Sequence, residues 1–86
     1  MSDHEKTDLE KSRDIISQLK EMQYYSKTNI EKLGELWIKV DTELKQKENA
    51  ELLETLINQQ NTFHDSLDSM ISDYEIECNR IENEEP

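Results

Sequence analysis

The fold is decided by one stretch in the middle of the chain, Leu44–Leu53, which reads LKQKENAELL. Before it, apolar residues recur at alternating intervals of three and four positions, the pattern of a helix with one buried seam. The eleven seam positions are Leu9, Ser12, Ile16, Leu19, Gln23, Ser26, Ile30, Leu33, Trp37, Val40 and Leu44, and eight of them are apolar. Continued past the stretch, the same spacing meets only the polar residues Lys47, Glu51, Glu54 and Asn58. The first seam therefore ends within this stretch.

A second apolar seam begins at the end of the same stretch. Its nine positions are Leu53, Leu56, Gln60, Phe63, Leu67, Met70, Tyr74, Glu77 and Ile81, and seven of them are apolar. This seam is displaced by two residues from the first. Because each residue turns a helix by about 100°, one straight helix would carry the two seams on nearly opposite faces. Discontinuities in coiled coils normally insert three or four residues. We therefore predict an all-α fold in which the chain reverses into an antiparallel, coiled-coil-like two-helix hairpin, in preference to one long rod.

The predicted hairpin forms a single domain. Its first helix covers residues 9–46, its turn residues 47–50 and its second helix residues 51–82. Residues 1–8 are predicted to be a flexible N-terminus and residues 83–86 an acidic tail. The capping-box match Thr7-x-x-Glu10 marks the candidate start of the first helix, and Ser2-x-x-Glu5 is a second match. Asn49 is the residue near the turn that adopts a left-handed conformation, or caps a helix, at least cost.

Both predicted helices have an apolar face wider than the two columns of a coiled-coil seam. The flanking columns are Ile15, Met22, Asn29 and Leu36 in the first helix, and Ile57, His64, Ile71 and Cys78 in the second. Two helices that face each other do not readily cover two faces of this width. We therefore expect the hairpin to complete a helical bundle as a homo-oligomer or a hetero-oligomer.

The residues predicted to bind the helical partner are the large side chains of the two seams. They are Ile16, Leu19, Ile30, Leu33, Trp37, Val40, Leu44, Leu53, Leu56, Phe63, Leu67, Met70 and Tyr74. Trp37 is the largest of them, and its position in the seam favours core packing over a role as an exposed anchor. The predicted function is that of a non-enzymatic interaction subunit or adaptor of a multi-protein complex.

The net charge of −11 suggests an alternative function. Residues 1–46 carry eight Lys/Arg against ten Asp/Glu, whereas residues 47–86 carry two against eleven. Such a chain repels nucleic acid and anionic lipid surfaces. It could instead act as a small acidic inhibitor, or nucleic-acid mimic, that occupies the basic groove of a target protein. The acidic surface in that case would comprise Asp65, Asp68, Asp73 and Glu75.

No pattern in the chain predicts catalysis, a cofactor or a metal. The His64 and Asp68 pair has helical spacing, but no second His or Cys lies near it, and His64 belongs to an apolar column. A single glycine rules out a glycine-rich phosphate loop. We therefore expect the chain not to be an enzyme.

The cellular location is predicted from the lack of a long apolar run and of a second cysteine. The longest apolar run, Leu36-Trp37-Ile38, is too short for a signal peptide or a membrane span. The single cysteine, Cys78, excludes an internal disulfide and fits a reducing compartment. We expect a cytoplasmic or nuclear protein. Export as a helical hairpin is a weaker alternative, because the WXG-type secreted hairpins carry Trp-x-Gly in their turn, whereas here Gly34 precedes Trp37 inside a predicted helix.

Overall fold

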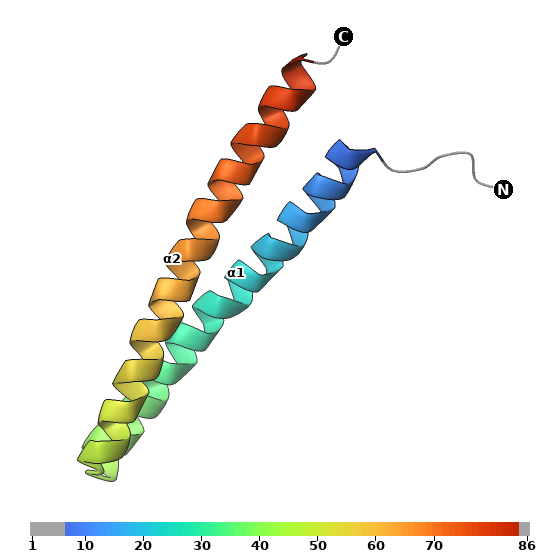
Figure 1. Cartoon of the computed structure of the whole chain (residues 1–86). Helices are drawn as coiled ribbons and strands as arrows, with labels where there is room; N and C mark the ends of the chain where they lie inside the picture. Colours follow the sequence, from blue (N-terminus) through green and yellow to red (C-terminus); the bar gives the residue numbers. More distant parts are fainter. Residues whose placement is uncertain (1–6, 85–86) are drawn as a thin grey trace, which may run out of the picture.

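The computed structural model describes residues 7–84, which form two long helices that lie side by side (Figure 1). Helix α1 spans Asp8–Ile38, the π-helical segment η1 spans Lys39–Glu43, and helix α2 spans Lys47–Glu84. The described residues contain no strand, and α1 packs against α2 along its length. The longest dimension is 63 Å, close to the length of about 57 Å that 38 helical residues give. The predicted all-helical hairpin is confirmed, and the rod is excluded.

The N-terminus of α1 is closed by the predicted capping box. The Thr7 hydroxyl accepts a hydrogen bond from the Glu10 backbone N–H at 3.1 Å, and the Glu10 carboxylate accepts one from the Thr7 N–H at 3.0 Å. These two bonds pair donors that the helix itself leaves unsatisfied. The other match, Ser2-x-x-Glu5, lies outside the described residues, as do the rest of residues 1–6 and the last two residues of the predicted tail.

The chain leaves the first helix through η1 and turns at residues 44–46, earlier than the predicted 47–50. The Leu44 N–H donates to the Lys39 carbonyl at 3.0 Å, and the Gln46 N–H donates to the Val40 carbonyl at 2.9 Å. These wide turns pair carbonyl groups that an ordinary helix end would leave to solvent. Lys45, with φ of 55°, takes the left-handed conformation that a reversal after a helix requires.

Asn49, which the sequence offered as a residue able to take the left-handed conformation or to cap a helix, does not make the reversal. It lies in the first turn of α2, where its side-chain amide donates to the Gln46 side-chain oxygen at 3.0 Å. The Ala50 N–H donates to the Gln46 carbonyl, also at 3.0 Å, so the helical bonding starts at Gln46. The residues expected to form the turn are the first four residues of α2.

Helix α1 turns its predicted seam toward α2. Ile16 and Ser26 are buried, and the remaining seam positions from Leu9 to Val40 are partly buried. Leu44 is the exception, because 58% of its surface is exposed. The wider π-helical turns rotate the chain before Leu44, so the seam does not extend to that residue.

Helix α2 uses a different pair of columns from the predicted seam. One is the predicted column that includes Leu53, Leu67 and Ile81; the other is the column that was expected only to flank it. The residues of α2 that are buried or partly buried in these two columns are Ala50, Leu53, Ile57, Gln60, His64, Leu67, Ile71, Tyr74, Cys78 and Ile81. The predicted positions Leu56, Phe63, Met70 and Glu77 are exposed. The two seams are thus out of register by one residue rather than two.

The physical reason for this correction is the content of the two competing columns. Placing the column of Leu56, Phe63 and Met70 inside would also bury the carboxylate of Glu77, at a large desolvation cost. The alternative column ends in Cys78, whose small side chain packs with Ile16 and Ile71 in the core. The observed register therefore buries Cys78 instead of Glu77 at the end of the hairpin where the core is best formed.

The middle of the hairpin is held by polar contacts. The Gln60 side chain donates to the Ser26 hydroxyl at 2.7 Å, and Ser26 is only 2% exposed. The Gln23 side chain donates to the Asp68 carboxylate at 2.7 Å. Polar seam positions of this kind lower stability but penalise any shift in register, since a shift would leave the groups unpaired.

Candidate protein-interaction face

One long side of the hairpin is apolar and uncovered; we call it the open face. It consists of Ile15, Met22, Asn29 and Leu36 of α1 with Leu56, Phe63, Met70 and Glu77 of α2. All eight residues are exposed. Each set of four repeats every seven residues on its helix, so each forms one straight column beside the seam. Because the helices are antiparallel, the two columns lie along the same side of the hairpin.

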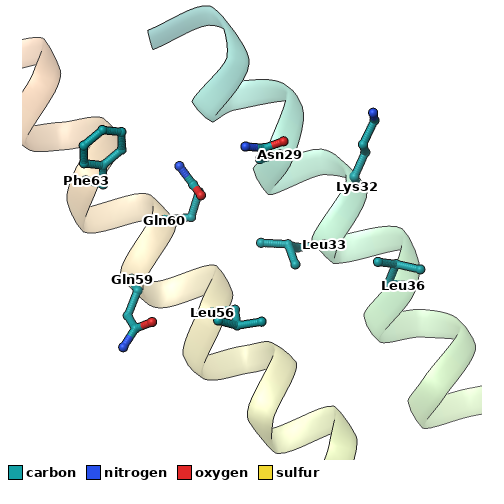
Figure 2. Close-up of a pocket in the computed structure, with 8 residues that line it drawn as sticks. All are labelled: Asn29, Lys32, Leu33, Leu36, Leu56, Gln59, Gln60 and Phe63. Atoms are coloured by element: carbon teal, nitrogen blue, oxygen red, sulfur yellow. The ribbon is translucent and has the colours of Figure 1, made fainter. Parts of the chain in front are cut away.

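A groove on the open face shows this arrangement near the turn (Figure 2). It has a volume of about 420 Å³ and runs between the two helices. The residues that line it are Asn29, Lys32, Leu33, Leu36, Leu56, Gln59, Gln60 and Phe63. Leu33 and Leu36 come from α1 and Leu56 from α2, and the lining also includes the amide-bearing residues Asn29, Gln59 and Gln60. Such a groove fits an apolar side chain with polar groups at its rim.

The burial of neighbouring residues in α2 marks the edge between core and open face. Phe63 is 44% exposed and Met70 50% exposed, whereas Leu67 and Ile71 are 6% and 5% exposed. Large apolar side chains that are half-exposed in a row are unusual for a face that stays in water, although single ones are common. The row therefore identifies the open face as the candidate interaction surface.

The opposite side of the hairpin is bridged by charged and polar groups; we call it the charged face. Arg13 forms an ion pair with Glu82 and a hydrogen bond of 3.2 Å to Asn79. Lys20 forms an ion pair with Glu75 at 2.9 Å. Both pairs join α1 to α2 across solvent-exposed positions. Charges on this face therefore bind within the chain, and the face contains no comparable apolar row.

Acidic residues are missing from the central part of the open face. The columns that border this central part are Gln18, Tyr25 and Lys32 on α1, continued by Lys39 of η1, and Leu52, Gln59 and Ser66 on α2; all seven residues are exposed. Between Ile15 and Lys39, and between Leu52 and Met70, neither the face nor this border contains Asp or Glu. The chain as a whole has 21 acidic residues in 86. Depletion of charge from the centre is typical of protein interfaces.

The residues predicted to bind a partner divide into two groups. Nine of the thirteen lie between α1 and α2, where they hold the hairpin together: Ile16, Leu19, Ile30, Leu33, Trp37, Val40, Leu53, Leu67 and Tyr74. The other four, Leu44, Leu56, Phe63 and Met70, are exposed. Ile15, Met22 and Leu36 also belong to the open face; they come from the flanking column of the first helix and not from its seam. The signal that marks them is the third apolar column of the first helix.

The four predicted acidic surface residues have different environments. Asp68 accepts the hydrogen bond from Gln23, and Glu75 pairs with Lys20. Both carboxylates are therefore engaged by α1, and Glu75 is paired with a positive charge. Asp65 and Asp73 are exposed.

Trp37 and His64 are both partly buried, and they lie in the seams of α1 and α2, respectively. The Trp37 Nε1 and His64 Nδ1 atoms are buried without a hydrogen-bond partner. Within residues 7–84 no group of three or more His, Cys, Asp or Glu residues is placed to hold a metal ion. Neither helix, over its described length, is apolar enough to cross a membrane.

Comparison with known proteins finds no family model that matches this chain, and no curated protein or solved structure with significant similarity to it.

Proposed function

We propose that this chain is a non-enzymatic protein–protein interaction subunit, and that the open face is the surface through which it packs against helices of its partner. The observation that carries the proposal is the row of half-exposed apolar side chains from both helices, free of acidic residues at its centre. Fully burying one exposed side chain of this size contributes roughly 1.5–3 kcal/mol, so covering the half that the hairpin leaves exposed contributes about half of that. Bringing six of them together against a partner therefore supplies a substantial driving force.

The two helices alone leave this row in water. The hairpin is only 13 Å thick in its shortest dimension, a single layer of helices. Helical domains normally bury an apolar stripe against a second layer. A partner that supplies one or two helices on the open face would complete a bundle.

The contacts on the charged face support this function over that of an acidic inhibitor. An acidic inhibitor needs carboxylates that are available to a basic groove. Two of the four candidates, Asp68 and Glu75, already bind Gln23 and Lys20 of the same chain.

The proposal is tested by site-specific photo-crosslinking in cells that express the chain. A photoreactive phenylalanine analogue is placed at Phe63 on the open face, or at Ile76, which is also exposed on α2 but lies beside Lys20 and Glu75. We expect one discrete protein adduct from position 63 and none above background from position 76. Equal crosslinking at both positions, or no protein adduct at position 63, would contradict the proposal.

A further inference from the structure

We infer that the partner of the open face is an amphipathic helix whose apolar stripe is bordered by Asp or Glu residues, which pair with Lys32 and Lys39. This inference rests on the proposed function and specifies the chemistry of the partner. It follows from the charge of the columns that border the open face, which is opposite in sign to the charge of the whole chain.

The border of the open face is basic, although the chain as a whole is acidic. The border column of α1, continued by Lys39 of η1, carries Lys11, Lys32 and Lys39 and no acidic residue. The border column of α2 carries Arg80 and one acidic residue, Asp73. The chain, in contrast, has a net charge of −11. Positive charge is therefore concentrated around the open face.

Two of these cations, Lys32 and Lys39, lie near the turn and are available to a partner. Lys32 lines the groove of the open face (Figure 2), and Lys39 follows it by one heptad in the same column. Both residues are exposed, and none of the ion pairs found within residues 7–84 involves either of them. The cations of the charged face, Arg13 and Lys20, are in contrast already paired with carboxylates of α2.

The acidic residues elsewhere in the hairpin do not cancel this local charge. The charged face lies across a layer of helices 13 Å thick, whereas charges are screened over about 8 Å at physiological ionic strength. Glu31 and Glu35 lie further round α1, outside the border column, and no ion pair joins them to Lys32 or Lys39. A ligand on the open face near the turn therefore meets positive charge.

The shape of the open face specifies a helix. Its column from Ile15 to Leu36 runs for about 32 Å along α1 and repeats every seven residues. A helix laid between α1 and α2 matches this length and this repeat. The residues that border its own apolar stripe then lie next to the border columns of the hairpin.

Charge decides what those bordering residues are. Carboxylates would pair with Lys32 and Lys39, whereas basic residues would be repelled by them, and like charges across an interface penalise the wrong partner. A second copy of this chain does not meet the requirement, because the centre of its own open face contains no Asp or Glu.

Fluorescence anisotropy with the full chain tests the inference. Two labelled synthetic helices of about 21 residues share one leucine stripe and carry either Glu or Lys at every position that borders it; we call them the Glu-flanked and the Lys-flanked peptide. At physiological ionic strength the Glu-flanked peptide should bind at least about fivefold more tightly, and high salt should reduce this preference. Equal affinities, the opposite preference, or no binding of either peptide would overturn the inference.

Charge reversal locates the preference on the open face. Lys32→Glu with Lys39→Glu should weaken binding of the Glu-flanked peptide by about tenfold or more and strengthen binding of the Lys-flanked peptide. The matched control is Lys27→Glu with Lys47→Glu, which changes the net charge equally in the heptad columns of Lys20 and Glu75. It should change either affinity by less than about threefold. Equal effects of the two double variants, each verified as folded by circular dichroism, would overturn the pairing with Lys32 and Lys39.

Failure of this inference is distinguishable from failure of the proposed function. If the two peptides bind equally, and Phe63→Asp removes the binding whereas Ile76→Asp does not, the open face still binds helices and only the charge of the partner is wrong. Binding that Ile76→Asp removes and Phe63→Asp leaves intact would contradict both. If neither peptide binds, the crosslink from position 63 decides the proposed function independently.

Discussion

The two long sides of this hairpin occupy equivalent positions beside the seam but are built from different chemistry. On the charged face, Arg13 and Lys20 reach across to Glu82 and Glu75. On the open face, the equivalent positions hold Ile15 and Met22 opposite a column that includes Met70. Exposed ion pairs contribute roughly 0.2–1 kcal/mol each. Covering the exposed half of one apolar side chain contributes roughly 0.8–1.5 kcal/mol, so burial of the six such side chains of the open face offers the larger gain on association.

The difference shows how one chain can specify both its fold and the side on which it associates. Ion pairs across the charged face disfavour a partner there, because docking would desolvate them. The open face has no such groups at its centre. In the proposed function, this difference directs a partner to the open face.

The largest expected effect separates the core from the open face with two adjacent residues. Ile71→Asp places a charge among Ile16 and Cys78 and should destabilise the fold by roughly 4 kcal/mol or more, which removes most of the helical signal. Met70→Asp, one residue earlier, should keep the helical signal of the isolated hairpin. Circular dichroism at low protein concentration measures both. Equal loss from the two variants would contradict the observed register of α2.

The next effect concerns association and uses a pair on α1. The Glu-flanked peptide, at about one hundred times its Kd, should raise Tm by roughly 10 °C. Leu36→Asp, on the open face, should abolish this rise, because its charge would be buried in the contact. Ile38→Asp, which is exposed away from the open face, should retain it. Thermal melts with and without the peptide test the pair, and a rise that survives Leu36→Asp would speak against the open face.

A smaller effect tests whether the charged face is free of other helices. A Cβ atom at Gly34 would meet nothing within 4 Å. Gly34→Ala should therefore stabilise α1 by roughly 0.8–1 kcal/mol through helix propensity alone. Chemical denaturation measures the gain. A loss of stability would indicate that another chain packs closely beside Gly34, on the side that we assign to solvent.

The smallest effect is expected for the ion pairs. Lys20→Glu should lower the free energy of unfolding by about 0.5–1 kcal/mol at low salt, since the new carboxylate faces that of Glu75. High salt should reduce the loss. The exchanged pair, Lys20→Glu with Glu75→Lys, should restore most of it. Denaturation curves at two salt concentrations provide the measurement, and a loss as large as that of Ile71→Asp would contradict the ranking of the two faces.

Much of the fold follows from the sequence because helical periodicity is a strong local signal. The seam of α1, the reversal near the middle of the chain and the capping box at Thr7 and Glu10 were all predictable from spacing. The position of the turn was not, because η1 is a wide segment without a glycine or proline to mark it. Lys45 takes the left-handed conformation there, although its residue type does not favour it.

The seam of α2 could not be assigned from periodicity alone. Its apolar face is three columns wide, and the spacing fits either pair of neighbouring columns. The choice depends on tertiary contacts: burial of Cys78 with Ile16, exposure of Glu77, and the pairing of Lys20 with Glu75. For the same reason the sequence predicted apolar faces that two helices do not fully cover, but it placed Leu56, Phe63 and Met70 in the seam, whereas they are exposed.

The most direct test of the open face is a titration with the Glu-flanked peptide followed by methyl NMR, since the chain places reporter groups on every side. Ile15, Met22 and Met70 lie on the open face, whereas Ile38 and Ile76 are exposed elsewhere. We predict that the methyl signals of Ile15, Met22 and Met70 shift or broaden as the peptide is added, while those of Ile38 and Ile76 stay unchanged. Changes confined to Ile38 and Ile76, or no change at any of the five, would contradict association through the open face.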